Sequence, residues 1–194
     1  MNALPTTEAA FLLLVALVAA QRLWEVRKSR AHEQALRAAG AVEHAPGQMR
    51  WMKLLHGAWL VACVAEAFLL DRAIWPAVSW IAIGVFLAGQ LLRLSAMRAL
   101  GPRWTVRILV LPGRPPVTRG IFRWVRHPNY LGVVLEVAAL PLIGGAWITA
   151  IVFSLLNGLM LWRRIVAEER ALEHANEYGA HLGDRPRLVP GGSP

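Results

Sequence analysis

Five apolar stretches divide this chain of 194 residues, and they restrict it to folds that suit a lipid bilayer. A helix needs about 20 apolar residues to cross a hydrocarbon core roughly 30 Å thick. The last two stretches are short and meet at Gly144-Gly145, so we expect them to tilt or to form a hairpin that barely reaches the far side. The five stretches are Pro5–Trp24, Leu54–Leu70, Trp75–Met97, Asn129–Gly145 and Ala146–Trp162.

The composition agrees with a membrane protein. Hydrophobic residues make up 56% of the chain and charged residues only 17%, whereas soluble domains carry about a quarter charged residues. The one cysteine, Cys63, excludes an intrachain disulfide and a cysteine-rich metal site, and we expect no bound metal. We therefore predict an all-α integral membrane protein with about five transmembrane helices and a cytoplasmic C-terminal amphipathic helix.

The charge distribution predicts the orientation. The net charge is +9, and most of the Lys and Arg residues lie in 21–50, 98–126 and 163–194. Five spans with the N-terminus outside place all three segments in the cytoplasm, as the positive-inside rule requires. In so apolar a chain this excess of positive charge favours anionic lipid headgroups as partners and not nucleic acid. A bacterial inner membrane fits this pattern, and the oligomeric state stays open.

Residues 117–136 hold the densest group of chemically useful side chains, VTRGIFRWVRHPNYLGVVLE. Gly120 and Gly132 allow the backbone to come close to another group. Pro128 suits the first turn of a helix, whose free N–H groups would face the cytoplasmic interface. His127 and Tyr130 flank that turn with groups that can donate and accept hydrogen bonds.

Two further polar features accompany this block. Glu136 lies at membrane depth, where it either pairs with an Arg or hydroxyl of a neighbouring helix or serves a functional site; we favour the site. After the last apolar stretch, LWRRIVAEERALEHANEYGAHLGDRPRLVP begins as a charged amphipathic helix and is expected to end at Pro186. Arg164 and Glu168 are four residues apart and share one helix face.

Together these blocks resemble the isoprenylcysteine carboxyl methyltransferase family and, more distantly, phospholipid methyltransferases. The matching residues are RHPNYLG at 126–132, EERAL at 168–172, Tyr178 and PRLVP at 186–190. Segments 22–43 and 103–120 resemble the bacterial branch found with type III polyketide synthases, which implies O-methylation of alkylpyrones or alkylresorcinols. The family often has a second tyrosine near the position of His181.

The resemblance implies a single membrane methyltransferase domain over 1–194, with a three-span part at 1–100 and a cofactor-binding and catalytic part at 101–194. It implies S-adenosylmethionine as cofactor, S-adenosylhomocysteine as product, and a lipophilic substrate that enters from the bilayer. Arg164 and Glu169 match acceptor-site residues, and to these we add Glu136 as a catalytic candidate. The residues that match the cofactor site are Gly120, Arg126, His127, Pro128, Tyr130, Gly132, Glu168, Tyr178 and Arg187.

The acceptor decides whether catalysis needs a base. A carboxylate is already anionic near neutral pH and needs only Arg164 to orient it. A phenol has a pKa near 10, so Glu169 or Glu136 could assist its deprotonation. We expect an alkylresorcinol or alkylpyrone hydroxyl, with a prenylcysteine carboxylate as the alternative. A non-catalytic scaffold that binds membrane lipids is the competing class of function.

Overall fold

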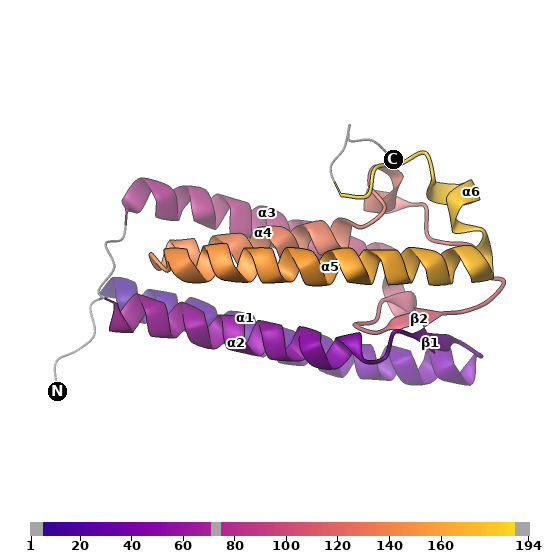
Figure 1. Ribbon diagram of the computed structural model, residues 1–194, viewed down its shortest axis with the longest axis horizontal. Coiled ribbons are helices and arrows are strands. Elements are labelled where there is room, and N and C mark those ends of the chain that lie inside the picture. Colours follow the sequence, from indigo (N-terminus) through magenta and orange to yellow (C-terminus); the bar gives the residue numbers. More distant parts are fainter. Residues whose placement is uncertain (1–5, 71–74, 189–194) are drawn as a thin grey trace.

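In the computed structural model, which describes residues 6–70 and 75–188, five long helices run side by side along the longest axis (Figure 1). Four of them are long and apolar enough to cross a membrane. The remaining helix has 16 residues and, at 1.5 Å per residue, is shorter than the hydrocarbon core. The helices are α1 (Thr6–Ala38), α2 (Gln48–Leu69), α3 (Pro76–Leu100), α4 (Pro128–Ile143) and α5 (Trp147–Asn176).

Each predicted apolar stretch corresponds to one helix, apart from a few residues at its ends such as Leu70, Trp75 and Gly144–Ala146, and Pro5 lies outside the described residues. α1 and α5 extend furthest beyond their apolar stretches. α1 continues beyond Trp24, and α5 joins the fifth apolar stretch to the charged segment that we expected as a separate helix. Residues 163–176 contain no glycine or proline and consist largely of strong helix formers, so nothing interrupts the helix. α5 ends before Glu177, whose backbone is left-handed with a φ of 50°.

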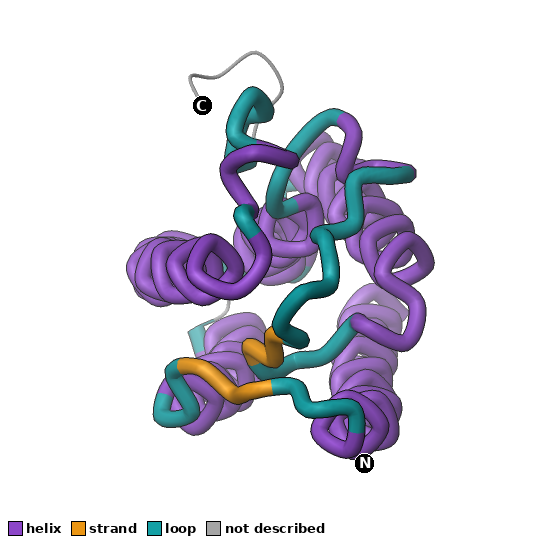
Figure 2. The backbone as a smooth tube through the Cα atoms, turned by 90° about the vertical axis from the view of Figure 1, so that its right-hand side faces the viewer, coloured by secondary structure: helices purple, strands orange, loops and turns teal. Residues whose placement is uncertain are grey.

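One end of the bundle, here called the sheet end, carries a small cap of non-spanning structure (Figure 2). Strands β1 (Val42–His44) and β2 (Ile108–Val110) pair antiparallel, with Val42 opposite Val110. The short helix α6 (Tyr178–Leu182) lies at the same end (Figure 1). The strands are a departure from the all-α prediction: Ile108 and Val110 bury their side chains against Ala171 of α5, which fixes this otherwise minimal sheet.

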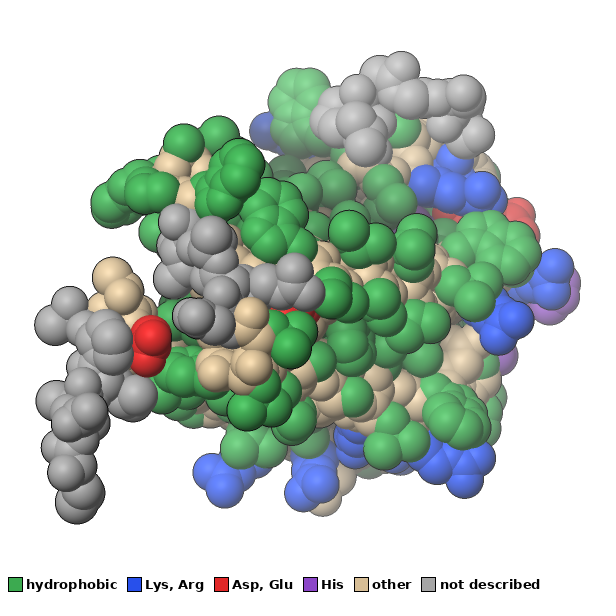
Figure 3. Space-filling view, turned by 60° about the vertical axis from the view of Figure 1, so that its left-hand side comes forward, with side chains coloured by type: hydrophobic (Ala, Val, Ile, Leu, Met, Phe, Trp, Pro, Cys, Tyr) green, Lys and Arg blue, Asp and Glu red, His purple; other side chains and the backbone are tan. Residues whose placement is uncertain are grey.

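The surface of the bundle is suited to lipid. Large apolar side chains such as Val61, Trp80 and Leu155 are exposed on α2, α3 and α5. Hydrophobic side chains cover most of the face in Figure 3, while Lys and Arg side chains lie mainly along its lower and right-hand margins. An exposed apolar surface of this extent indicates a membrane-embedded bundle.

The helix α4 is held in the interior by close packing against α3. Gly89 and Gly132 face each other, so that a Cβ atom on Gly132 would overlap the Gly89 carbonyl and the Arg93 side chain. Small residues at such crossings let two membrane helices approach closely. A cluster of buried apolar residues from α1, α2, α3 and α4 fills the rest of the interior around Trp59, Phe86 and Leu140.

Candidate functional site

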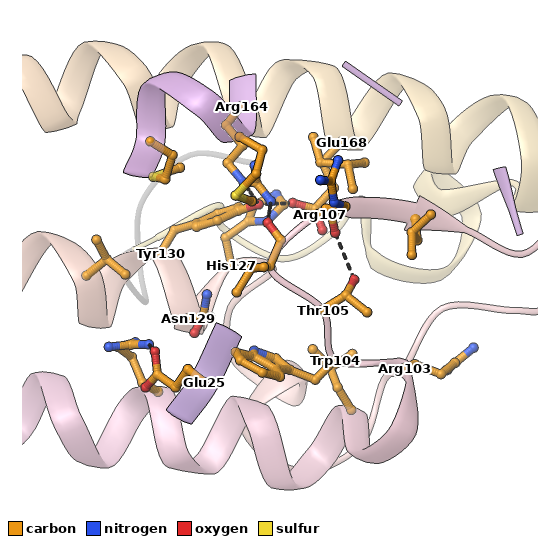
Figure 4. Close-up of a pocket in the computed structure, with 18 of the residues that line it drawn as sticks. Glu25, Arg103, Trp104, Thr105, Arg107, His127, Asn129, Tyr130, Arg164 and Glu168 are labelled. Atoms are coloured by element: carbon orange, nitrogen blue, oxygen red, sulfur yellow. Dashed lines mark hydrogen bonds and ion pairs between the residues drawn. The ribbon is translucent and has the colours of Figure 1, made fainter. Parts of the chain in front are cut away.

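A cavity of about 590 Å³ opens inside the bundle toward the sheet end, and we call it the central cavity. Pockets for small molecules are commonly about 300–1,000 Å³. Its walls come from α1, α2, α3, the segment 103–117, α4, α5 and α6. Figure 4 shows that side chains from opposite sides of the bundle point into the same space. The polar and ionisable residues used below are Arg22, Glu25, His56, Arg93, Arg126, His127, Asn129, Tyr130, Arg164, Glu168, Asn176 and Tyr178.

One wall of the cavity is a hydrogen-bonded group from α4 and α5. Tyr130 donates its hydroxyl hydrogen to Glu168 and accepts a hydrogen bond from Arg164 Nε at 2.8 Å. The His127 ring stacks on Tyr130 with 5.4 Å between ring centroids. Pro128 occupies the first turn of α4 and places His127 directly before the helix. This wall therefore offers an aromatic face, a carboxylate and a guanidinium to one ligand.

Behind this wall, the Glu169 carboxylate contacts the His127 imidazole and the guanidiniums of Arg126 and Arg187. Its carboxylate is 3.1 Å from His127 Nε2, 3.4 Å from Arg126 Nη1 and 2.8 Å from Arg187 Nη2. Arg187 donates hydrogen bonds to the Glu169 carboxylate, and these raise the pKa of Arg187, which keeps its guanidinium positively charged. The backbone N–H groups of Arg126 and His127 also donate to the carbonyls of Pro186 and Arg187. The C-terminal segment is thereby fixed against the start of α4.

Tyr178 completes the wall from α6. It is buried, and its ring lies 6.5 Å from the His127 ring. Burial raises the pKa of its hydroxyl, so that Tyr178 presents a neutral phenol to the cavity.

The opposite wall carries a second polar group, of which sequence reasoning identified Glu136 but not Glu25. Glu25 of α1 accepts hydrogen bonds from Arg22 at 2.7 Å and from Arg93 of α3 at 2.5 Å. Glu136 of α4 bonds to the same two arginines, at 2.8 Å from Arg93. Figure 4 places Glu25 across the cavity from Tyr130, with Asn129 between them. The two carboxylates pair with the two guanidiniums, so no charge in this group is left unpaired inside the apolar bundle.

The structure brings together most of the residues that the motifs predicted. Six of the nine cofactor-site candidates line the central cavity, namely Arg126, His127, Pro128, Tyr130, Glu168 and Tyr178. Of the three catalytic candidates, Arg164 lines it. Gly120, Gly132, Glu136, Glu169 and Arg187 are outside its lining.

These five residues have visible structural roles. Gly132 allows α3 and α4 to pack closely, and Gly120 adopts a φ of +64° beside Ala99. Glu136 pairs with Arg22 and Arg93, while Glu169 and Arg187 pair with each other behind His127. The motif end PRLVP is described as far as Leu188, and its residues 189–190 lie outside the described part of the chain.

Two asparagines that line the central cavity have side-chain oxygens available to an N–H donor. The side-chain oxygens of Asn129 and Asn176 are buried and accept no hydrogen bond from the described residues. Buried acceptors without a donor are uncommon in native structures, because each loses its bonds to water. Asn129 belongs to the RHPNYLG motif, which could have identified it, whereas Asn176 closes α5 without a motif of its own.

These features suit S-adenosylmethionine. Its sulfonium is cationic and is favoured beside the Glu168 carboxylate and the Tyr130 ring. Its amino acid part needs donors for a carboxylate, which Arg126 offers, and acceptors for an ammonium, which Asn129 offers. The residues present therefore fit this cofactor.

Comparison with known proteins agrees with the site geometry. The model of the isoprenylcysteine carboxyl methyltransferase (ICMT) family matches residues 81–174, which include α4 and most of α5. The uncharacterized protein YpbQ of Bacillus subtilis is 35% identical over 84% of this chain and 96% of its own length. An uncharacterized protein of Haemophilus influenzae is 30% identical over 82% of this chain and 92% of its own length.

A eukaryotic relative carries a functional name. The protein-S-isoprenylcysteine O-methyltransferase of Schizosaccharomyces pombe is 26% identical over 76% of this chain and 68% of its own length. The bilayer-suited helix bundle, the polar wall between α4 and α5 and these relationships lead to one assignment. The chain belongs to the isoprenylcysteine carboxyl methyltransferase family of membrane methyltransferases.

Proposed function

We propose that this protein transfers the methyl group of S-adenosylmethionine to an oxygen atom of a lipophilic acceptor inside the central cavity. The observation that carries the proposal is the wall formed by His127, Tyr130, Arg164 and Glu168, which faces a cavity within a lipid-suited helix bundle. When bound, the cofactor supplies a methyl group activated by a positively charged sulfur.

The cofactor end of the cavity is proposed to lie at the sheet end. Tyr130 and Glu168 stabilise positive charge there, and Arg126 binds a carboxylate. Asn129 and Asn176 accept N–H donors through the oxygens that have no partner among the described residues. Gly120, Gly132 and Arg187 contribute by holding α4 and the C-terminal segment in place. Cofactor and acceptor that fill this part of the cavity exclude water from the transfer step.

The acceptor is proposed to reach the same space from the side of α1 and α2, whose apolar residues line the cavity. Arg164 orients the reacting oxygen, because its guanidinium is buried and lines the cavity. Glu169 acts through His127, and Glu136 acts through Arg93, since neither carboxylate lines the cavity.

We favour a hydroxyl acceptor of the alkylresorcinol or alkylpyrone type, because segments 22–43 and 103–120 resemble the branch with those substrates. A prenylcysteine carboxylate is the second candidate, and the name of the Schizosaccharomyces pombe relative supports it. The basic residues at the sheet end favour a cytoplasmic active site and an outward N-terminus in a bacterial inner membrane.

Two measurements on the detergent-purified protein test the proposal. Calorimetric titration with S-adenosylhomocysteine should show saturable binding, and radiolabelled S-adenosylmethionine should label an added alkylresorcinol or S-farnesylcysteine. Absence of S-adenosylhomocysteine binding would contradict the methyltransferase and favour a lipid-binding scaffold. Binding with methylation of S-farnesylcysteine alone would replace the first acceptor by the second.

A further inference from the structure

His56 of α2 lines the central cavity, and its hydrogen bonding leaves one ring nitrogen available to a ligand. Its Nδ1 atom is 2.9 Å from the backbone carbonyl oxygen of Met52. A carbonyl oxygen only accepts hydrogen bonds, so Nδ1 carries the hydrogen. In the neutral ring this tautomer places a lone pair on Nε2.

Among residues 6–70 and 75–188, no group bonds to His56 Nε2, and this atom is not one of the fully buried polar atoms without a partner. The ring packs edge-on against Trp59, with 6.2 Å between centroids, which holds its orientation. Arg22 from α1 and Arg164 from α5 are the charged groups that act on it. His56 therefore lines the same cavity as Glu25 and Tyr130.

The carboxylates near the cavity are already engaged. Glu25 accepts hydrogen bonds from Gln21, Arg22 and Arg93. Glu136, which does not line the cavity, pairs with the same two arginines. Glu168 accepts the Tyr130 hydroxyl, and Glu169 binds Arg187 behind His127. Arginines therefore already donate to the carboxylates of Glu25, Glu136 and Glu169, and Tyr130 donates to that of Glu168, whereas His56 Nε2 has no donor or acceptor among the described residues.

We propose that His56 is the general base of this enzyme and that its acceptor is a neutral hydroxyl-bearing amphiphile, an inference that rests on the proposed methyltransferase function. The hydroxyl proton moves to His56 Nε2 as the oxygen attacks the methyl carbon. An O–CH₃ bond forms, the S–CH₃ bond breaks, and its electron pair returns to sulfur, which becomes a neutral thioether. The imidazolium then releases its proton to solvent.

This assignment separates the two acceptor classes by chemistry. A phenolic hydroxyl with a pKa near 10 is almost entirely protonated at neutral pH, so a base accelerates its methylation. A carboxylate is ionised at the same pH and gains nothing from a base. The availability of Nε2 therefore favours the hydroxyl acceptor.

The test compares His56→Gln with His174→Gln, which changes an exposed histidine at the end of α5. With a long-chain alkylresorcinol at pH 7, we expect His56→Gln to lower kcat by about 10²-fold or more. With S-farnesylcysteine, or in the control variant, the change should stay within about twofold. The wild-type rate should rise with pH through one ionisation that His56→Gln lacks, and both variants should bind S-adenosylhomocysteine like the wild type.

A second readout does not depend on turnover. In ¹⁵N-histidine NMR spectra of the S-adenosylhomocysteine complex, the alkylresorcinol should shift a resonance that is missing in His56→Gln. Loss of kcat within about twofold on the alkylresorcinol would overturn the assignment, as would an equal loss on both acceptors. A wild type that binds S-adenosylhomocysteine but methylates no hydroxyl probe would overturn it too. Failure to bind S-adenosylhomocysteine would instead defeat the proposed function itself.

Discussion

The hydroxyl group of Tyr130 in α4 donates a hydrogen bond to the Glu168 carboxylate in α5. The same hydroxyl accepts a hydrogen bond from Arg164, so one oxygen atom fixes the positions of a carboxylate and a guanidinium on the neighbouring helix. Because both partners line the central cavity, this contact sets the shape and charge of the proposed cofactor wall.

Replacement of Tyr130 by Phe removes this oxygen and keeps the ring that stacks on His127. Glu168 and Arg164 each lose one hydrogen bond, and such losses to charged partners cost about 1.5–3 kcal/mol. We expect the affinity for S-adenosylhomocysteine, measured by calorimetry, to fall by about tenfold or more. Unchanged affinity in a variant with normal thermal stability would show that Tyr130 does not organise the cofactor wall.

The close crossing of α3 and α4 predicts a penalty for Gly132→Ala. The new methyl group would overlap the Gly89 carbonyl and the Arg93 side chain, and overpacking of this kind costs about 1–3 kcal/mol. Gly158→Ala in α5 is the matched control, because a Cβ atom there meets no other atom within 4 Å. Thermal unfolding in detergent should therefore show a lower midpoint for Gly132→Ala and an equal or higher one for Gly158→Ala. Equal midpoints would refute the packing role.

Hydropathy alone predicted where the five long helices lie, because each apolar stretch must satisfy its backbone within a helix. Hydropathy could not predict that α1 continues to Ala38 or that α5 continues to Asn176, since those extensions are polar. The strands β1 and β2 were also missed. They have three residues each and depend on burial against α5, which is a tertiary effect.

The candidate site also has one part that the sequence predicted and one part that it did not. The motifs predicted the wall around His127, Tyr130 and Glu168, because RHPNYLG and EERAL fall on helices that pack together. The wall around Glu25 joins residues of α1, α3 and α4 that are far apart in sequence. Pairing of Glu136 with an Arg of a neighbouring helix was one of the two expectations for it, but only the packing of the three helices identifies Arg22 and Arg93 as the partners and adds Glu25.

A carboxylate from a neighbouring helix caps the start of α5. Glu66 of α2 accepts hydrogen bonds from the backbone N–H groups of Ile148 at 2.9 Å and Thr149 at 2.6 Å. In Glu66→Gln, the amide nitrogen cannot accept a hydrogen bond, so one buried N–H group loses its acceptor at a cost of about 1–3 kcal/mol. We expect a lower unfolding midpoint in detergent, whereas the exposed change Glu177→Gln should leave it unaltered. A midpoint equal to that of the wild type would exclude this role.

The ion pairs at the sheet end predict a loss of stability at acid pH. Burial raises the pKa of Glu43, but hydrogen bonds from Arg37 and Arg107 outweigh it and hold the pKa below its ordinary value of 4.5. The stabilisation is therefore present above pH 4.5 and is lost as the pH falls through the lower, folded-state pKa. The pairs are partly exposed, so we expect about 1 kcal/mol or less. Thermal unfolding at pH 7 and pH 3.5 should show a larger decrease for the wild type than for Glu43→Gln, and parallel decreases would contradict this assignment.

Glu169→Gln distinguishes a base from a positioning residue. Glu169 lies behind His127 and binds Arg126 and Arg187, so its charge holds the C-terminal segment against α4. The neutral amide would weaken those contacts without changing a group that lines the cavity. We expect the affinity for S-adenosylhomocysteine to fall by roughly tenfold, and kcat/KM to fall by the same factor on an alkylresorcinol and on S-farnesylcysteine. Arg187→Ala removes the other half of the contact and should reproduce the loss. A much larger loss on the alkylresorcinol would instead assign the base to Glu169, because only the hydroxyl acceptor requires one.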